Sequence, residues 1–199
     1  MTPGIGRCIT PVILAVPDRV RRLPIRERVR ALSAQAREAL RICAVESGVE
    51  LGPLEKKPNG APVPFDGHHW SLTHKPAYVG AVISRQAAGI DIEAVKEVSD
   101  GLIRKTAGER EWRLAAVDPA EVFFRYWTAK EAVLKAAGSG MAGLSDCRVV
   151  EIPDAGHLGL EYGEASYLVE HFFFDGHVAS VVKNRLQVDW KLFQKVRDV

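Results

Sequence analysis

Two acidic residues two positions apart are the first candidates for chemistry in this chain of 199 residues. Asp91 and Glu93 lie in a predicted strand, so both side chains point to one face while Ile90 and Ile92 point to the other. Adjacent carboxylates repel each other unless a cation or a proton lies between them. Mg²⁺ binds one or two carboxylates together with waters and substrate phosphates, so this pair is a candidate half of a magnesium site. The alternative is an ordinary half-exposed strand whose acids face water.

A second pair of charged residues lies further along the chain. Glu131 and Lys135 are four positions apart, so they share one face of a predicted helix. One interpretation is a surface ion pair worth about 0.3–0.5 kcal/mol. The other places Glu131 at the metal and Lys135 on a phosphate oxygen beside it, an arrangement that phosphoryl transfer requires. The spacing alone does not decide between them.

These residues need one helix and one strand to position them. The helix is predicted from Asp118, a suitable N-cap followed by proline, to Ala137, where a glycine-rich stop follows. The acidic pair needs a strand over 89–93. Further helices are predicted over 25–46 and 99–116, and further strands over 13–16, 70–74, 78–83, 166–174 and 177–183.

Two segments with the same order of residue types suggest an internal duplication. Residues 74–83 and 171–182 each begin with histidine and lead through a turn into an apolar strand. The halves of the chain are also nearly equal in length. We therefore predict an α+β fold of two similar lobes, 1–98 and 99–199, each with an antiparallel sheet and a helix.

The active site is expected in the cleft between these two lobes. Asp91 and Glu93 end a strand assigned to the first lobe, and Glu131 and Lys135 come from a helix assigned to the second. A single shared ion would then join the lobes. In such a cleft we expect Asp91 and Glu131 to be exposed acids.

The composition excludes several classes of protein. Its 47% hydrophobic and 26% charged residues exclude a disordered chain. No apolar run approaches the roughly 20 residues that a membrane helix needs. Cys8, Cys43 and Cys147 are far apart and outside metal-binding spacing, which predicts buried, unpaired thiols in a reducing compartment. We expect a cytoplasmic protein that does not bind membranes.

Positive charge gathers in one segment although the net charge is only +2. Residues 19–41 contain eight arginines and two glutamates. They form either a solvated helix face or a surface for a phosphate-rich or acidic partner, since arginine offers a planar fork to phosphate oxygens. The isoelectric point of about 8.5 and the lack of interleaved aromatic residues do not indicate nucleic acid binding.

Both candidate pairs lie in segments that resemble the two signatures of the 4′-phosphopantetheinyl transferases. Residues 89–93 are similar to the pattern Gly-[Ile/Val]-Asp-[Ile/Val/Leu]-Glu. Residues 127–135 are similar to the longer pattern Trp-[Ser/Thr]-x-Lys-Glu-x-x-x-Lys, and 138–141 fit the Gly-x-Gly that follows it. The order and separation also fit. The length resembles that of the monomeric, two-lobed type that activates peptide and polyketide synthases.

This resemblance implies a reaction and a set of roles. The 4′-phosphopantetheine arm of coenzyme A would pass to a serine of an apo acyl, peptidyl or polyketide carrier protein, with release of adenosine 3′,5′-bisphosphate. Asp91, Glu93 and Glu131 would hold Mg²⁺. Glu131 would take the serine proton, directly or through a metal-bound water, and Lys135 would stabilise the transferring phosphate. Trp127 is expected to pack its helix on the sheet.

The resemblance carries three coenzyme A contacts over to this chain and lacks a fourth. Thr73 and His74 end a segment similar to the family's [Phe/Trp]-[Asn/Ser]-[Ile/Leu]-[Ser/Thr]-His strand, which reaches coenzyme A phosphates. Arg37 lies in an Ala-Arg-x-x-Leu helix pattern and would meet the ribose phosphate. The family's Gly-[Lys/Arg]-Pro segment has Ala61 in place of its basic residue, which puts coenzyme A affinity in doubt.

Two functions from different classes follow. The first is the active transferase, which the intact set of acids and Lys135 favours. The second is a non-catalytic carrier-protein or coenzyme A-binding module of the same fold, which Ala61 alone suggests.

Overall fold

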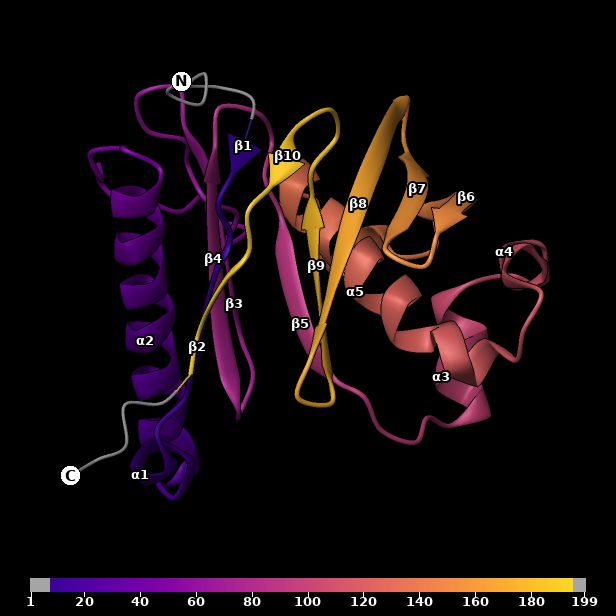
Figure 1. Ribbon diagram of the computed structural model, residues 1–199, viewed down its shortest axis with the longest axis horizontal. Helices are drawn as coiled ribbons and strands as arrows, with labels where there is room; N and C mark the ends of the chain where they lie inside the picture. Colours follow the sequence, from indigo (N-terminus) through magenta and orange to yellow (C-terminus); the bar gives the residue numbers. More distant parts are fainter. Residues whose placement is uncertain (1–7, 195–199) are drawn as a thin grey trace.

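A mixed α+β fold is found in the computed structural model, which describes residues 8–194. Two sheets and two long helices form most of it (Figure 1). In chain order the elements are β1 (Cys8–Ile9), β2 (Val12–Ala15), α1 (Asp18–Arg21), α2 (Ile25–Glu46), β3 (His69–His74), β4 (Tyr78–Ser84), β5 (Ile90–Ala94), α3 (Asp100–Thr106), α4 (Glu109–Ala115), α5 (Pro119–Ala137), the 3₁₀ turn η1 (Met141–Gly143), β6 (Arg148–Asp154), β7 (His157–Tyr162), β8 (Ala165–Phe174), β9 (His177–Val182), β10 (Gln187–Val188) and β11 (Lys191–Phe193).

The two larger sheets meet along their edge strands and also pack apolar side chains against each other, in a buried cluster that includes Ile13 of β2, Tyr78 of β4 and Ile92 of β5. One sheet has the strand order β11-β2-β4-β3, and the other has the order β5-β9-β8-β7-β6. Edge strand β3 of the first sheet therefore lies next to edge strand β5 of the second, as Figure 1 shows. Helix α2 packs on the first sheet and α5 on the second. The residues at this seam come from both sheets.

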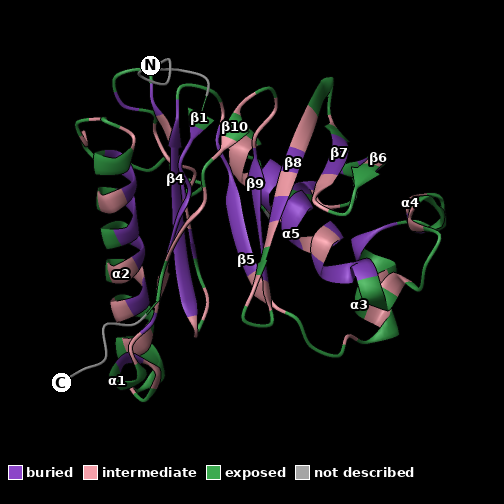
Figure 2. Cartoon of the chain, viewed as in Figure 1, coloured by how far each residue is buried: buried purple, intermediate pink, exposed green. Residues whose placement is uncertain are grey.

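Helix α2 follows the pattern that its sequence predicts. It spans Ile25–Glu46, as expected for 25–46, and Gly48 ends the turn after it with a φ of 63°. Its apolar stripe, which includes Leu32, Leu40 and Cys43, is buried, while its arginine-rich side faces outward (Figure 2). The core of the first sheet thus fills the space between α2 and β2–β4.

The helix predicted over 99–116 is wrong as a single element. The chain forms α3 and α4 instead, because Ala107 takes an extended conformation with φ −153° and ψ 158°. Gly108 then caps α4, and its backbone N–H donates to Glu111 Oε2 at 2.9 Å. The helix that matters for the site is confirmed: α5 begins after Asp118, whose side chain accepts from the N–H of Ala120, and ends at Ala137.

Several strands are absent from the sequence expectations, and one of them, β11, changes the connectivity. The predicted strands over 70–74, 78–83 and 166–174 are confirmed with small shifts, whereas β6, β7 and the short β10 and β11 are not expected. Strand β5 pairs antiparallel with β9, and the returning β11 pairs parallel with β2. Strand pairing thus crosses the division at residue 98. Residues 1–7 and 195–199 lie outside the described residues, and the division into lobes 1–98 and 99–199 stays a prediction.

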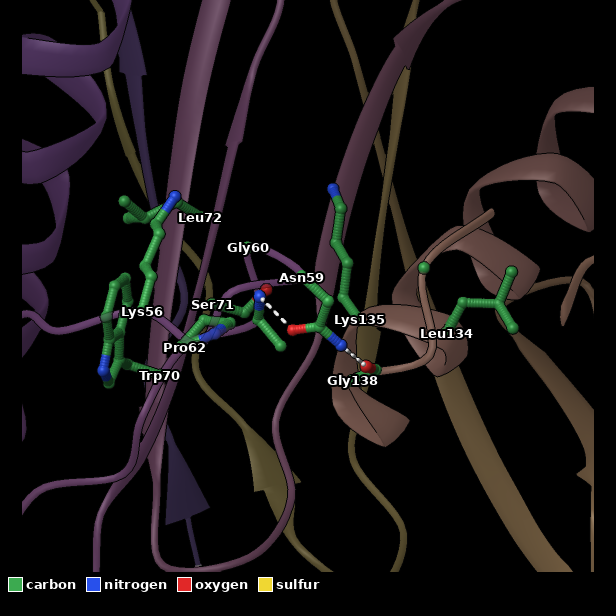
Figure 3. A pocket seen from close by; sticks show the side chains of 12 residues that line it. Lys56, Asn59, Gly60, Pro62, Trp70, Ser71, Leu72, Leu134, Lys135 and Gly138 are labelled. Carbon is green, nitrogen blue, oxygen red and sulfur yellow. Dashed lines mark hydrogen bonds between the residues drawn. The ribbon is translucent and has the colours of Figure 1, made fainter. Parts of the chain in front are cut away.

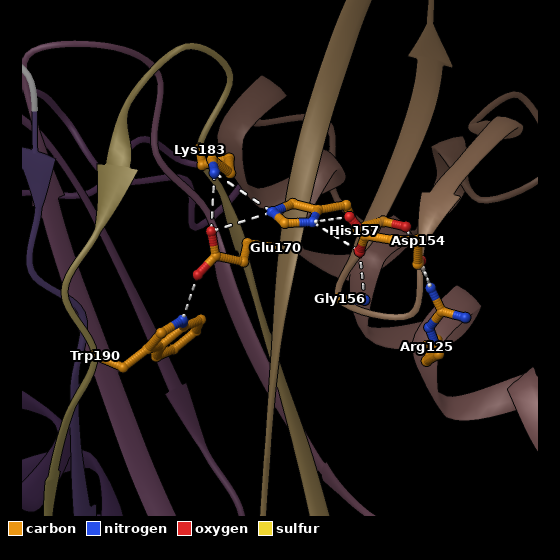
Figure 4. Close-up of polar contacts among 7 residues, drawn as sticks. All are labelled: Arg125, Asp154, Gly156, His157, Glu170, Lys183 and Trp190. Atoms are coloured by element: carbon orange, nitrogen blue, oxygen red, sulfur yellow. Dashed lines mark hydrogen bonds and ion pairs between the residues drawn. The ribbon is translucent and has the colours of Figure 1, made fainter.

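A charged network fixes the returning end of the chain to the second sheet (Figure 4). Glu170 on β8 accepts from Lys183 Nζ at 2.9 Å and from Trp190 Nε1 at 3.1 Å. His157 on β7 lies between Glu170 and Asp154, with its ring nitrogens 3.3 Å and 2.9 Å from their carboxylates. These contacts hold the segment that leads back to β2.

Two further expectations concern the chain as a whole. Cys43 and Cys147 are buried thiols whose pKa is raised to about 12, mainly by burial, but Cys8 is exposed, contrary to expectation. All three are free. None of the helices between residues 8 and 194 has the length and apolar character needed to cross a membrane.

Helix α5 approaches the second sheet closely at one glycine. A Cβ atom placed on Gly89, just before β5, would lie 1.8 Å from the carbonyl oxygen of Ala132 and 2.9 Å from the backbone N of Ala136. Both are backbone atoms of α5, so no rotamer change relieves the clash. The absence of a side chain at Gly89 sets how close Glu131 and Lys135 come to β5.

Gly89→Ala is expected to destabilise the protein by about 1–3 kcal/mol, because a backbone shift of α5 is needed to accommodate the methyl group. Gly101→Ala is the matched control: its Cβ meets nothing within 4 Å, and alanine suits the interior of α3. Urea unfolding of both variants measures the effect. A Gly89→Ala protein as stable as Gly101→Ala would show that this close approach does not exist.

Candidate functional site

Polar side chains connect the two sheets along the seam between β3 and β5. Ser71 Oγ accepts from the backbone N–H of Ile90 at 3.3 Å, and Thr73 Oγ1 donates to Asp91 Oδ1 at 2.8 Å. Lys75 Nζ donates to Glu93 Oε1 at 2.6 Å. Alternate residues of one edge thus face β5 in order, as the side-chain period of a strand requires. This ladder presents both acids of β5 to the first sheet.

Asp91 is the most deeply placed acid of the site. Its side chain is only 1% exposed, and Oδ1 accepts from Thr73 and from Lys135 Nζ, which lies 2.8 Å away. Its other oxygen, Oδ2, is buried without a hydrogen-bond partner among the described residues. The expectation of an exposed acid is therefore wrong for Asp91, because β3 and α5 cover it. An unpaired buried oxygen is a natural position for a cation ligand.

Glu93 lies nearer the surface and has two donors. Lys75 Nζ and Trp127 Nε1 both donate to its Oε1, at 2.6 Å and 3.2 Å. Trp127 also packs, partly buried, against the apolar core between α5 and the second sheet. The expected packing role of Trp127 is thus confirmed, and its indole N–H has a polar role as well.

Glu131 faces the same cluster from α5. The pKa of its half-buried carboxyl is raised, first by burial and then by the negative charge of Asp91, while Lys135 and Lys75 lower it. Among residues 8–194 it has no hydrogen-bond partner. The surface ion pair of Glu131 with Lys135 is not formed, since Lys135 instead donates to Asp91 and, at 3.0 Å, to the carbonyl of Ile90.

Lysines balance this concentration of acids. Burial alone lowers the pKa of Lys75, but the charges of Asp91, Glu93 and Glu131 outweigh it, so that the pKa lies above its ordinary value. The pKa of exposed His74 is lowered, first by desolvation and then by Lys135 and Lys75. His74 therefore lies close enough to both ammonium groups to be affected by their charge.

A pocket of about 210 Å³ opens beside the cluster (Figure 3). Residues of the loop before β3 and of β3 itself line one side, and the end of α5 lines the other, as the sticks in Figure 3 show. Asn59 joins the two sides, because its Nδ2 donates to the carbonyl of Gly138 at 3.1 Å. Lys135 extends along the wall and connects the pocket with Asp91.

Two sequence expectations about coenzyme A concern Ala61, which lines this pocket, and Arg37, which does not. Ala61, which replaces a usual basic residue, lines the pocket, and exposed Lys56 lines it too. Lys56 is bridged to Pro62 in a small antiparallel turn, so its backbone lies across from the Ala61 segment. Arg37 is exposed on α2 and makes none of the contacts described for the cluster. Its role stays a prediction.

The three carboxylates are groups of the kind that bind a divalent cation, although their side chains do not converge on one point in this structure. Among the described residues, no three His, Cys, Asp or Glu side chains converge into a group that could hold a metal ion. Magnesium nevertheless needs only one or two carboxylates beside water and phosphate oxygens. The unpartnered Oδ2 of Asp91 and the unbonded carboxylate of Glu131 are available donors. The residues therefore fit the cation that the sequence implies.

Three residues of the cluster were not expected from the sequence. Ser71 and Lys75 share the face of β3 that carries Thr73, and extending that alternation by two positions would have identified both. Trp127 was assigned to packing alone. Its contact with Glu93 needs the approach of α5 to β5, which no local pattern reveals.

Comparisons with known proteins match this part of the chain. Residues 87–182 match the family described as the 4′-phosphopantetheinyl transferase superfamily. Similar proteins include 4′-phosphopantetheinyl transferase HetI of a Nostoc species, which is 34% identical over 120 residues, or 53% of this chain and 51% of HetI. The enzyme gsp of Aneurinibacillus migulanus is 35% identical over 93 residues, 44% of this chain and 39% of gsp. The enzyme psf-1 of Bacillus pumilus is 32% identical over 99 residues, 46% of this chain and 42% of psf-1.

The matched part of the chain spans about half or less of the length of these relatives. It includes β5 and α5 and therefore all three acids and Lys135.

Two substitutions at the cluster should change stability in opposite directions. Asp91→Asn leaves Lys135 without its charged partner and should lower the free energy of unfolding by about 1–3 kcal/mol.

Glu131→Gln should raise the melting temperature at pH 7. A carboxyl with a raised pKa binds more protons in the folded state, so stability falls as pH rises from its ordinary value through the folded value, and the full cost is present at neutral pH. Glutamine has no such cost.

Melting curves at pH 7 in EDTA measure both effects. Equal melting temperatures for wild type and Glu131→Gln at pH 7 would contradict the placement of Glu131 beside Asp91.

Proposed function

We propose that the chain transfers the 4′-phosphopantetheine arm of coenzyme A to a serine of an apo carrier protein, because residues 87–182 match the 4′-phosphopantetheinyl transferase superfamily. Adenosine 3′,5′-bisphosphate leaves. The observation that carries the proposal is the clustering of Asp91, Glu93, Glu131 and Lys135 from two separate signatures, with Lys135 also lining the pocket beside them.

The acids are proposed to hold a magnesium ion. Asp91 through Oδ2, Glu93 and Glu131 are the residues that would bind it. When bound, the ion supplies positive charge that offsets the charge of the diphosphate and of its leaving group. Lys135 holds Oδ1 of Asp91 and thereby directs Oδ2 away from itself, which keeps one carboxylate oxygen available.

Glu131 is the proposed general base. A base acts best when its pKa lies nearer the working pH than that of a free carboxyl, and burial beside Asp91 moves Glu131 in that direction. Its carboxylate has no hydrogen-bond donor among residues 8–194, so it is ready to accept the proton of the serine hydroxyl. It does so directly or through an intervening water.

Lys135 is the proposed electrostatic stabiliser of the transferring phosphate. The serine Oγ–P bond forms while the P–O bond to the bisphosphate breaks, and the phosphoryl oxygens carry the negative charge in between. Lys135 reaches from the pocket wall to Asp91, and its side chain is 29% exposed, so it can meet a phosphate without leaving the cluster.

The pocket is the proposed coenzyme A site. Lys56 is suited to replace the basic residue missing at Ala61, since both line the same pocket. His74 and Thr73 are proposed to contact the phosphates, Thr73 also by fixing Asp91. Arg37 is proposed to meet the ribose phosphate.

The remaining proposals concern architecture and partners. We propose that the fold is two-lobed, with the site between the lobes, that the protein acts as a monomer in the cytoplasm, and that its partner is an apo acyl, peptidyl or polyketide carrier domain. The non-catalytic module is the second candidate. Ala61 favours it, whereas the presence of Lys56 in the pocket favours turnover.

Incubation of apo carrier domains with coenzyme A and Mg²⁺ tests the function directly. We expect the wild-type protein to add one phosphopantetheine, detected by the intact mass of the carrier. Asp91→Ala and Glu131→Ala should each lower the rate at least about a hundredfold. Binding of coenzyme A without any mass gain across a panel of carriers would favour the non-catalytic module.

Lys135→Ala and Arg37→Ala should have different kinetic effects. Lys135 acts on charge that develops during transfer, so its loss should lower kcat by more than about tenfold with a smaller change in KM. Arg37 would meet a phosphate that does not react, so its loss should chiefly raise the KM for coenzyme A. Steady-state kinetics in which Lys135→Ala chiefly raised KM and Arg37→Ala chiefly lowered kcat would contradict these roles.

A further inference from the structure

Lys75 is the cation of the cluster for which the proposed reaction has no role. It begins the short connection between β3 and β4, where its backbone N–H donates to the carbonyl of Tyr78 at 2.8 Å and Pro76 follows it. This tight turn fixes the backbone, while the side chain remains a flexible stem with a compact charge at its end. Lys75 is 28% exposed in its side chain, so its ammonium group is not enclosed.

The ammonium group of Lys75 and a divalent cation need the same oxygen atoms. Lys75 Nζ is 2.6 Å from Glu93 Oε1, which also accepts from Trp127. Mg²⁺ binds carboxylate oxygens at about 2.0–2.1 Å. Oε1 already accepts from one ammonium and one indole N–H, so it has no room for a metal ion as well, and two cations a few ångströms apart repel each other. Glu93 can bind a metal through Oε1 only if Lys75 moves, and a metal at Oε2 would be repelled by the nearby ammonium group.

We propose that Lys75 is a tethered cation that neutralises the acidic cluster in the metal-free protein and competes with the divalent metal for Glu93. The ammonium group keeps Glu93 and its neighbouring acids from repelling one another, and metal entry displaces it. Lys75 thus acts through Glu93 as a positioning residue. This inference rests on the proposed function in one respect, namely that a divalent cation binds at these acids.

The arrangement has two consequences that a merely structural lysine would not have. Removal of the ammonium group should strengthen metal binding, because the metal no longer has to displace a competitor. It should also lower the stability of the metal-free protein, because Lys135 would then be the one cation left among the described residues of the cluster to offset the charge of three acids. The same substitution should therefore raise the affinity for the metal and lower the melting temperature of the metal-free protein.

Titration of the full chain with Mn²⁺, followed by the EPR signal of free Mn²⁺ and without coenzyme A, tests the proposal. Lys75→Gln should lower the Kd for Mn²⁺ about three- to tenfold and lower the melting temperature in EDTA, with saturating Mn²⁺ restoring it. Lys75→Met, which keeps an apolar stem, is the second variant should glutamine be poorly tolerated. Lys75→Arg keeps the charge and should leave the Kd at or above the wild-type value.

Lys57→Gln is the matched control, since it removes an exposed lysine from the neighbouring turn at residues 56–62 and should leave the Kd within about twofold of wild type. An unchanged or higher Kd in both Lys75→Gln and Lys75→Met overturns the proposal, as does an equal gain in Lys57→Gln. Absence of Mn²⁺ binding in the wild type and in every variant also overturns it. The mass assay of transfer decides the proposed function separately, because it does not depend on the Mn²⁺ affinities.

Discussion

The site depends on the mutual repulsion of three carboxylates at the seam between two sheets. Asp91 and Glu93 face the seam from edge strand β5, and Glu131 faces it from α5. Acids this close require compensating charge, and Lys75 and Lys135 supply it from opposite sides of the seam. This charge balance joins the sheets at the site, beside the apolar contacts between them that include Ile13 and Ile92.

Two further features hold this balance in place. Gly89 lets the backbone of α5 approach β5 closely enough for Lys135 to reach both Asp91 and the carbonyl of Ile90. Thr73 and Ser71 fix the register between β3 and β5 from the other side. A half-buried Glu131 without hydrogen-bond donors is unfavourable for stability, yet it is suited to accept a proton. Strain of this kind at a site is expected where function requires it.

The sequence allowed the elements with strong local signals to be predicted, along with the residues that they carry. The capped α5 and the amphipathic α2 were predicted to within a few residues, and both acids of β5 were assigned to one face. The pairing of β5 with β9 and of β11 with β2 could not be predicted, because register across such distances depends on tertiary packing. The break at Ala107 was missed although Gly108, which caps α4, follows it directly.

The burial of Asp91 and the position of Lys75 were missed for the same reason. Both follow from the meeting of β3 with β5, which is a contact between edges of different sheets. Alternation along β3 would have placed Lys75 on the face of Thr73, but it does not say what that face meets. The exposed Arg37 shows the converse: a motif match identifies a residue, whereas the contacts that would define its role involve a ligand.

The central claim is that these acids from β5 and α5 form one cation site. Anomalous diffraction from crystals grown with Mn²⁺ and coenzyme A tests it most directly. The account predicts one strong manganese peak within about 2.5 Å of carboxylate oxygens of both Asp91 and Glu131, with Lys75 Nζ withdrawn from Glu93. A manganese peak bound by neither acid, or none at all beside a bound coenzyme A, would contradict the account.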